Sequence, residues 1–184
     1  FGEDVALLAG DSFLTHAFSC ITDNNEYDGE LKSILVSQLA SLSGLNGMIY
    51  GQLLDVTSNS ADIDSNKLIE IQDNKTGGLF KISCLMAMYI SGLKQESYFI
   101  NLGSQIGQIF QNQDDLFDLI KSEEELGKTH SDVKNDKGTA LSIYTKEELE
   151  AIIDKQFKDL DINLSNAQFD TTYLKELIYK LRTR

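Results

Sequence analysis

The chain has 184 residues, of which 41% are hydrophobic and 24% charged, and this is enough apolar material for a compact core. Its 16 Lys and Arg residues against 29 Asp and Glu give a formal net charge of −13, so we expect no nucleic-acid binding through phosphates. Cys20 and Cys84 lie in apolar runs and indicate no disulfide framework. No apolar run reaches the length of a membrane span, and no basic segment precedes an apolar one at the start. We therefore expect a cytoplasmic protein without a membrane span.

The chain contains no proline, and its apolar residues recur every three or four positions, so the sequence predicts an all-α fold. Helices are expected at residues 4–21, 29–56, 65–74, 76–92, 95–121, 146–160 and 169–182. The segments at 22–28, 57–64 and 122–139 are rich in Asp, Asn, Ser, Gly and charged residues, which is typical of turns.

The expected helix at 29–56 is long and apolar on nearly every side, which favours a buried central helix. It carries the small residues Ser43, Gly44, Gly47 and Gly51. Small residues lower helix propensity unless they allow close packing, so we expect neighbouring helices to approach it closely.

The start of the chain already has a helical apolar pattern. Val5 to Leu8 are apolar, no cap precedes them, and the first residue is Phe1. We therefore expect residues 1–184 to be the C-terminal portion of a single domain whose upstream helices are absent from the sequence given.

Paired acids occur in the expected helix at 95–121. At about 100° per residue, Gln111, Asp114 and Asp118 share one face at the edge of the apolar stripe. Carboxylates one turn apart repel unless a cation lies with them or one keeps a proton, so a hard divalent ion is a natural companion. The alternative is a solvated acidic face.

Three lysines occur beside glycine and threonine: Lys75 in Asn74-Lys75-Thr76-Gly77, Lys128 after Gly127, and Lys137 before Gly138-Thr139. Such a lysine can bind an anion, although the first segment alone more often marks a helix junction. Together with the carboxylates, these lysines suit a diphosphate, because Mg²⁺ commonly binds one or two carboxylates together with substrate phosphates.

A further polar pair, Gln52 and Asp55, lies one turn apart in the 29–56 segment. The pair is either part of a site or hydrogen-bonded to neighbouring helices. His16 and His130 do not have the spacing of a metal pair, and the sequence offers no convincing Ser–His–Asp or Cys–His set. A zinc enzyme or nucleophilic hydrolase is therefore disfavoured.

Five segments, in order, resemble the trans-isoprenyl (polyprenyl) diphosphate synthases, the family of farnesyl and geranylgeranyl diphosphate synthases. They are Phe1 to Leu14 ("FGE…LAGDALL"), Gly47 to Asp55 ("GM..GGQ..D"), Lys75-Thr76-Gly77 ("HKTG"), Phe110 to Asp118 ("FQ.QDD..D"), and Lys128 with Lys137-Gly138-Thr139 ("LGK" and "GK.T"). The resemblance covers essentially the whole chain. It implies an isoprenoid-synthase-type helical bundle around a central cavity.

The resemblance also implies roles for individual residues. Asp114 and Asp118 would hold Mg²⁺, with Asp115 as a weaker or outer ligand. The catalytic residues would be Lys75, Thr76, Gln111 and Lys128, and the substrate-binding residues would be these four with Phe110, Lys137, Gln52 and Asp55. The basic tail, Lys180, Arg182 and Arg184, would close over a second diphosphate or form a solvated helix end.

The activity implied is transfer of a prenyl group from an allylic diphosphate to isopentenyl diphosphate, giving a longer, short-chain trans-prenyl diphosphate, in a homodimer. The alternative is a catalytically incomplete family member that acts as a regulatory or partner subunit. The family's first aspartate-rich motif would lie upstream of Phe1. At two places the sequence differs from the usual residues of the family in a way that concerns the shape of the pocket. Tyr50 stands where glycine is usual and would narrow the cavity beside Gln52, and Ala140-Leu141 stands where Tyr-Pro is usual.

Overall fold

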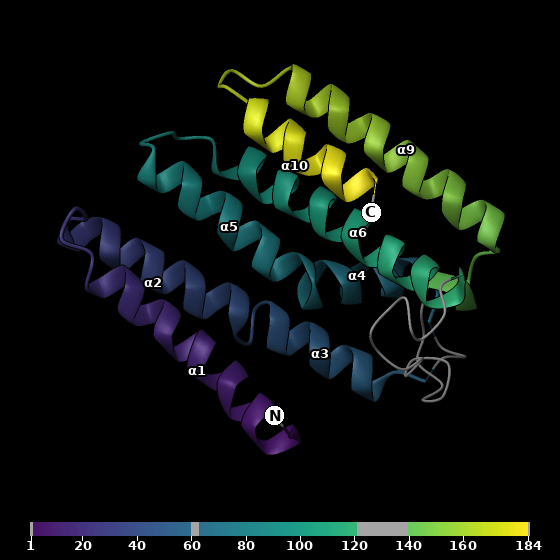
Figure 1. The fold of residues 1–184 in the computed structure, drawn as a ribbon, viewed down its shortest axis with the longest axis horizontal. Helices are drawn as coiled ribbons and strands as arrows, with labels where there is room; N and C mark the ends of the chain where they lie inside the picture. The colour runs from purple at the N-terminus through teal and green to yellow at the C-terminus, as the bar shows by residue number, and fades with distance from the viewer. Residues whose placement is uncertain (1, 60–62, 121–139, 184) are drawn as a thin grey trace.

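The computed structural model describes residues 2–59, 63–120 and 140–183 (Figure 1). These residues form helices and turns without a strand, which confirms the all-α prediction. The helices are α1 (Glu3–Thr22), α2 (Gly29–Ser43), α3 (Met48–Thr57), α4 (Ser65–Lys75), α5 (Gly77–Ile90), α6 (Glu96–Ile120), the short 3₁₀ helix η2 (Ala140–Ser142), α9 (Lys146–Ser165) and α10 (Thr172–Arg182).

The helices lie roughly side by side in the order α1, α2, α5, α6 and α9, with α10 against α9 (Figure 1). α5 and α6 form the most extensive helix pair and stand at the centre. α3 continues the line of α2, and α4 packs against α3, α5 and α6. Three segments therefore meet at one end of the bundle: α3, the α4–α5 junction and the C-terminal half of α6.

The prediction of one helix at 29–56 was wrong, because the chain breaks between α2 and α3. The backbone turns so tightly there that a Cβ on Gly47 would collide with the Leu42 carbonyl, and one on Gly44 with the Ala40 carbonyl. Gly44 and Gly47 therefore permit an interruption of the helix, whereas the sequence had suggested that the small residues serve close packing by neighbouring helices.

The two parts of this segment are also buried differently. α2 buries Leu35 and Leu39, whereas Gly51 is the buried residue of α3. Leu53 of α3 is 54% exposed and Val56 62% exposed. The expected burial on every side is thus wrong for α3 in the described structure.

The main hydrophobic core lies between α4, α5, α6, α9 and α10. Its fully buried side chains are Leu85, Met88, Leu102, Ile109, Leu149, Leu160 and Leu164. Complete burial of each such side chain contributes about 1.5–3 kcal/mol. A smaller cluster of Ile21, Leu35, Leu39 and Ile82 joins α1 and α2 to α5. This packing holds α6 rigidly against α5 along most of its length.

α9 begins where the sequence predicts a helix but ends later, at Ser165. Its start is fixed by a capping box: the Glu148 N–H donates to Thr145 Oγ1 at 3.2 Å, and the Thr145 N–H donates to Glu148 Oε2 at 2.8 Å. This end of α9 follows directly after η2.

α1 carries an apolar face on the outside. Val5, Leu7, Leu8 and Phe13 are at least half exposed, and Ile21 is the buried residue of this helix. By length and composition α1 could cross a membrane, contrary to our expectation that no segment would, although one such helix near the N-terminus is weak evidence. The described residues leave this apolar face uncovered.

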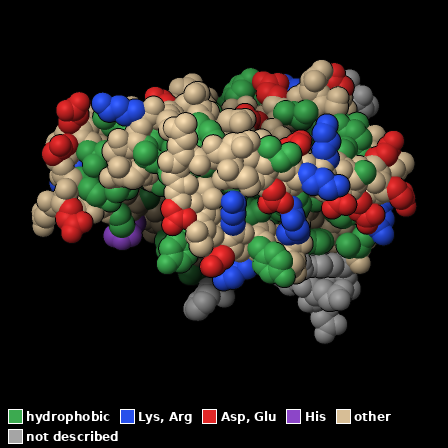
Figure 2. Space-filling model, turned by 90° about the horizontal axis from the view of Figure 1, so that it is seen from above, with side chains coloured by type: hydrophobic (Ala, Val, Ile, Leu, Met, Phe, Trp, Pro, Cys, Tyr) green, Lys and Arg blue, Asp and Glu red, His purple; other side chains and the backbone are tan. Residues whose placement is uncertain are grey.

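One face of the molecule mixes charges of both signs. On the face drawn in Figure 2, Lys and Arg side chains lie among Asp and Glu side chains rather than in a patch of their own.

Candidate active site

The junction of α4 and α5 brings a lysine to the end of the bundle where α6 finishes. α4 ends at Lys75 and α5 begins at Gly77, so Thr76 alone connects them. α3 approaches this junction so closely that a Cβ on Gly51 would collide with the Lys75 backbone. Gly51 therefore allows α3 to pack closely against the α4–α5 junction, as the sequence indicated for this small residue.

Lys75 is paired with Asp55 across this contact. Its Nζ donates to Asp55 Oδ2 at 2.6 Å, and the side chains are 33% and 7% exposed, respectively. Gln52, one turn before Asp55, is exposed. The sequence left open whether Gln52 and Asp55 belong to a site or bond to neighbouring helices. Asp55 does bond to a neighbouring helix, and its partner is Lys75, the predicted anion-binding lysine.

Thr76 connects the junction to the acidic helix. Its hydroxyl donates to Gln111 Oε1 at 2.7 Å, and Gln111 Nε2 donates to Asp115 Oδ1 at 2.9 Å. The Ala140 N–H donates to Asp115 Oδ2 at 2.8 Å. Residues far apart in the sequence therefore form one hydrogen-bonded chain from the α4–α5 junction through α6 to η2.

Asp115 differs from the two acids beside it. It is 5% exposed and accepts hydrogen bonds on both carboxylate oxygens, whereas Asp114 and Asp118 are partly exposed on the adjoining face of α6. The carboxyl group of Asp115 is therefore placed to hold Gln111 and η2, and Asp114 and Asp118 are the better candidates for metal ligands.

A magnesium ion fits this donor set only as part of a complex with substrate. Within residues 2–59, 63–120 and 140–183, no group of three or more His, Cys, Asp or Glu side chains could hold a metal. Asp114 and Asp118 offer hard oxygen donors one helical turn apart. Mg²⁺ usually combines one or two carboxylates with waters and substrate phosphates, so these two acids suit an ion shared with a diphosphate.

Phe110 lies at the apolar side of the site. Its ring is 5.4 Å from that of Phe80, centroid to centroid, at 49°. Beyond Phe80, an apolar cavity of about 520 Å³ runs between α5, α6 and α10, lined by Cys84, Leu102, Ile106 and Leu174 among others. Phe80 lines this cavity and contacts Phe110, the residue before Gln111.

Tyr50 does not narrow a cavity beside Gln52 as expected. Its hydroxyl donates to Glu70 Oε1 at 3.0 Å, and Lys67 Nζ lies 3.0 Å from Glu70 Oε2. The hydrogen bond to Glu70 raises the pKa of Tyr50, and the hydrogen bond from Lys67 lowers the pKa of Glu70. The side chain turns toward α4 because residues 50 and 52 lie on nearly opposite sides of α3.

Two predicted site residues, Lys128 and Lys137, lie outside the described residues. Of the basic tail, Arg182 is bound to α9: its Nη2 donates to Asp161 Oδ2 at 2.8 Å, and its guanidinium lies 4.5 Å from the Phe157 ring centroid. Arg182 is thus an exposed residue at the end of α10, paired with α9.

The sequence analysis missed a polar cluster behind the junction. Lys81 of α5 pairs with Asp73 of α4, Ser104 of α6 donates to the same carboxylate, and Gln72 bonds to Asn112. The signal available was a lone lysine in the otherwise apolar segment 77–90, because a buried lysine needs a partner.

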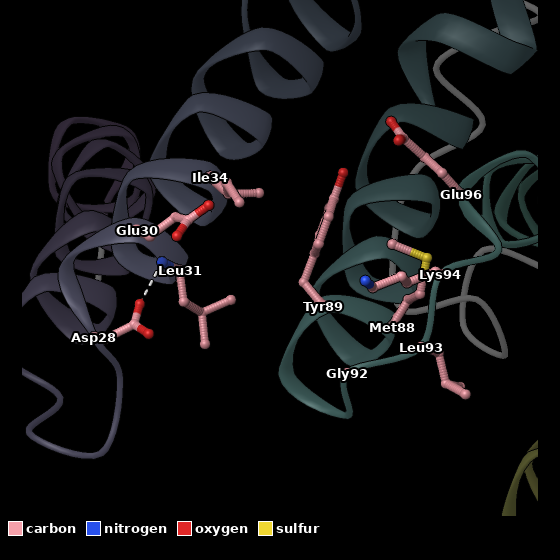
Figure 3. A pocket seen from close by; sticks show the side chains of 10 residues that line it. All are labelled: Asp28, Glu30, Leu31, Ile34, Met88, Tyr89, Gly92, Leu93, Lys94 and Glu96. Atoms are coloured by element: carbon pink, nitrogen blue, oxygen red, sulfur yellow. Dashed lines mark hydrogen bonds between the residues drawn. The ribbon is translucent and has the colours of Figure 1, made fainter.

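A second cavity, of about 510 Å³, lies at the opposite end of the bundle. It opens between the start of α2 and the end of α5, where Leu31 and Ile34 stand across from Tyr89 and Met88 (Figure 3). It contains none of the predicted site residues.

The two cysteines should react at very different rates. Burial raises the pKa of the Cys84 thiol to about 11, whereas Cys20 is exposed. Because the thiolate is the nucleophile, we expect iodoacetamide at pH 8 to modify Cys84 roughly a hundredfold more slowly than Cys20. The Cys84 rate should rise about tenfold per pH unit until the pH nears 11. Peptide mapping by mass spectrometry measures both rates, and equal rates at pH 8 would contradict the burial of Cys84.

Comparison with solved structures identifies the class of fold. The chain superimposes on geranyltransferase from Helicobacter pylori, complexed with magnesium and isoprenyl diphosphate, with a TM-score of 0.84 and 25% identity over 100% of this chain and 61% of that chain. A geranyltransferase from Legionella pneumophila gives a TM-score of 0.76 at 25% identity, again over 100% of this chain and 61% of that one. The bundle is thus of the isoprenoid-synthase type.

The chain belongs to the polyprenyl synthetase family, whose model matches residues 1–178. It is 35% identical over 181 residues to farnesyl diphosphate synthase from Micrococcus luteus, covering 97% of this chain and 62% of that protein. The farnesyl diphosphate synthase from Bacillus subtilis is 32% identical over 186 residues, with 98% and 62% covered. The resemblance found in the motifs is confirmed, and the chain spans about three fifths of the length of these relatives.

Proposed function

We propose that the protein is a Mg²⁺-dependent trans-prenyltransferase that condenses isopentenyl diphosphate with an allylic diphosphate to make a short-chain prenyl diphosphate. The observation that carries the proposal is the hydrogen bond between Thr76 and Gln111. This bond joins the α4–α5 junction, which carries Lys75, to the turn of α6 that precedes Asp114. The cation and the carboxylate that a metal-bound diphosphate requires would therefore lie near each other. The farnesyl diphosphate synthases to which the chain is similar support this choice of substrates.

The proposed roles follow from these positions. Asp114 and Asp118 would hold magnesium ions, which supply positive charge to the leaving diphosphate when bound. Lys75 would contact the diphosphate while Asp55 holds its ammonium group in place, and the Thr76 hydroxyl and Gln111 would be oriented by buried Asp115. Lys128 and Lys137 are proposed, from the resemblance alone, as further diphosphate ligands.

The proposed reaction requires positive charge near the leaving diphosphate and the exclusion of water from the allylic cation. The bond between the allylic carbon and its diphosphate oxygen breaks, the alkene of isopentenyl diphosphate forms the new carbon–carbon bond, and a proton leaves the product. Preorganised charge stabilises the departing diphosphate, and apolar walls exclude water from the cation. Phe110, packed on Phe80, would form part of such a wall.

Magnesium and diphosphate should bind together. Carboxylates alone repel the anion, and the metal relieves that repulsion. We expect a non-hydrolysable allylic diphosphate analogue to bind the full-length protein at least about tenfold more tightly with Mg²⁺ than without it, measured by titration calorimetry. An Asp114→Asn/Asp118→Asn variant is the control and should lose this dependence. Equal affinity of the unaltered protein in both conditions would overturn the proposal, and binding without turnover would favour a partner subunit.

The homodimer and the cytoplasmic location expected from the sequence are part of this proposal. Both cysteines are free, which suits a reducing compartment. A second copy could cover the apolar face of α1, because large apolar patches on proteins commonly mark contact surfaces.

A further inference from the structure

A partly buried ionic cluster lies directly behind the α4–α5 junction, with the Lys81 side chain 11% exposed and the Asp73 side chain 29% exposed. Lys81 Nζ lies 2.6 Å from Asp73 Oδ2 and 3.0 Å from the Asp73 carbonyl oxygen, and the Ser104 hydroxyl donates to Asp73 Oδ1. We propose that Asp73 and Lys81 are positioning residues that hold Lys75 and Thr76 in place for diphosphate binding. This inference rests on the proposed function of the site.

A contribution to stability alone does not explain why the charged residues Lys81 and Asp73 are paired beside the apolar core. Lys81 is 8% exposed, and Ile82 and Leu85 on the same helix belong to the apolar core. Replacing a buried ion pair by apolar side chains of similar volume is often neutral or stabilising, because the charges no longer have to be desolvated. The pair therefore calls for a reason other than its contribution to folding.

The geometry of the pair gives that reason at the end of α4. Asp73 lies in the last turn of this helix, where backbone carbonyls lack intrahelical partners and an acidic side chain opposes the helix dipole. Lys81 compensates for both the unpaired carbonyl and the unfavourable acid, because its ammonium group donates to the Asp73 carbonyl oxygen and to the Asp73 carboxylate. It thereby ties the last turn of α4 to the first turns of α5 around the single connecting residue Thr76.

The same turn of α4 is also fixed to α6. Ser104 holds the Asp73 carboxylate, and Gln72 Nε2 donates to Asn112 Oδ1 at 3.0 Å. α5 and α6 touch backbone to backbone beside the cluster, because a Cβ on Gly103 would collide with the Lys81 backbone. These contacts fix how far α4 and α5 are shifted along α6. At this alignment Thr76 reaches Gln111, which lies one turn before Asp114.

The test uses the full-length protein with inorganic pyrophosphate and Mg²⁺ as the probe, measured by titration calorimetry beside thermal melting. We expect Lys81→Met and Asp73→Asn to weaken pyrophosphate binding about tenfold. Lys81→Arg, which keeps the cation, should restore most of the affinity. The doubly apolar variant Asp73→Leu/Lys81→Met should melt near the unaltered protein and still bind weakly. Lys67→Met, which removes the exposed pair with Glu70 on the same helix, is the matched control and should change neither readout.

Several results would overturn the inference. If Lys81→Met and Asp73→Asn melt lower but their folded fractions bind pyrophosphate normally, the cluster is only structural. Should Lys81→Met fail to fold, Ser104→Ala removes one hydrogen bond only, and we expect it to weaken binding twofold to threefold; normal binding by this variant would count against the inference. If the unaltered protein does not bind magnesium pyrophosphate, the proposed function fails and the inference fails with it.

Discussion

Replacing Asp114 by alanine in the full-length protein should lower kcat by roughly a hundredfold to a thousandfold, the range found when a group that stabilises transition-state charge is removed. The same change should leave the free energy of unfolding within about 0.5 kcal/mol of its original value. Asp114 is partly exposed on α6 and lies one turn from Asp118, so its removal relieves a repulsion between like charges. Steady-state kinetics and thermal melting measure the two effects.

The matched control is Asp154→Ala on the exposed face of α9. It removes the same charge from a helix away from the junction and should change neither kcat nor the melting temperature. A fall of many degrees in the melting temperature of Asp114→Ala would identify Asp114 as a structural residue and remove it from the site.

Asp115→Ala should instead lower the stability by about 2–4 kcal/mol, because one buried and one partly buried donor would be left without their acceptor. The donors are Gln111 Nε2 and the Ala140 N–H. For a chain of this size the melting temperature should fall by roughly 5–15 °C. Activity should fall as well, since Gln111 and through it Thr76 lose their orientation.

Asp115→Asn separates the possible roles of this acid. The amide keeps the shape of the carboxylate but offers one acceptor where the protein supplies two donors, so this variant should also lose stability. If Asp115→Asn melts normally and yet loses Mg²⁺-dependent pyrophosphate binding, Asp115 acts as a metal ligand, as the resemblance first implied, and the positioning role is wrong.

The site could be predicted where its residues lie close together on one helix. Gln111, Asp114 and Asp118 share a face through the period of the α-helix, and α6 runs over nearly the same residues as the predicted helix. The different burial of Asp115 could not be predicted in the same way. It depends on Ala140, which lies 25 residues further along the chain, and helical periodicity does not report on contacts between distant segments.

Two other features escaped prediction for related reasons. The interruption between α2 and α3 depends on backbone dihedral angles at Gly44 and Gly47, whereas the apolar pattern of the segment is equally compatible with one helix. The pairing of Lys75 with Asp55 and of Lys81 with Asp73 depends on how three helices cross. Sequence alone identified Lys75 and Asp55 as separate candidates, but it carried no information on their being partners.

Under the proposed function, the ion pair between Lys75 and Asp55 has a consequence for how fast a diphosphate would reach the site. A lysine whose charge is balanced at 2.6 Å presents a dipole to distant ions, and the field of a dipole fades much faster than that of a free charge. The chain as a whole carries a formal charge of −13, so a bare diphosphate approaching from solution is repelled overall rather than steered. Added salt would screen that repulsion and speed its arrival, the reverse of the usual behaviour of an anion site. The species that would meet the least repulsion on approach is therefore a diphosphate that already carries a metal ion.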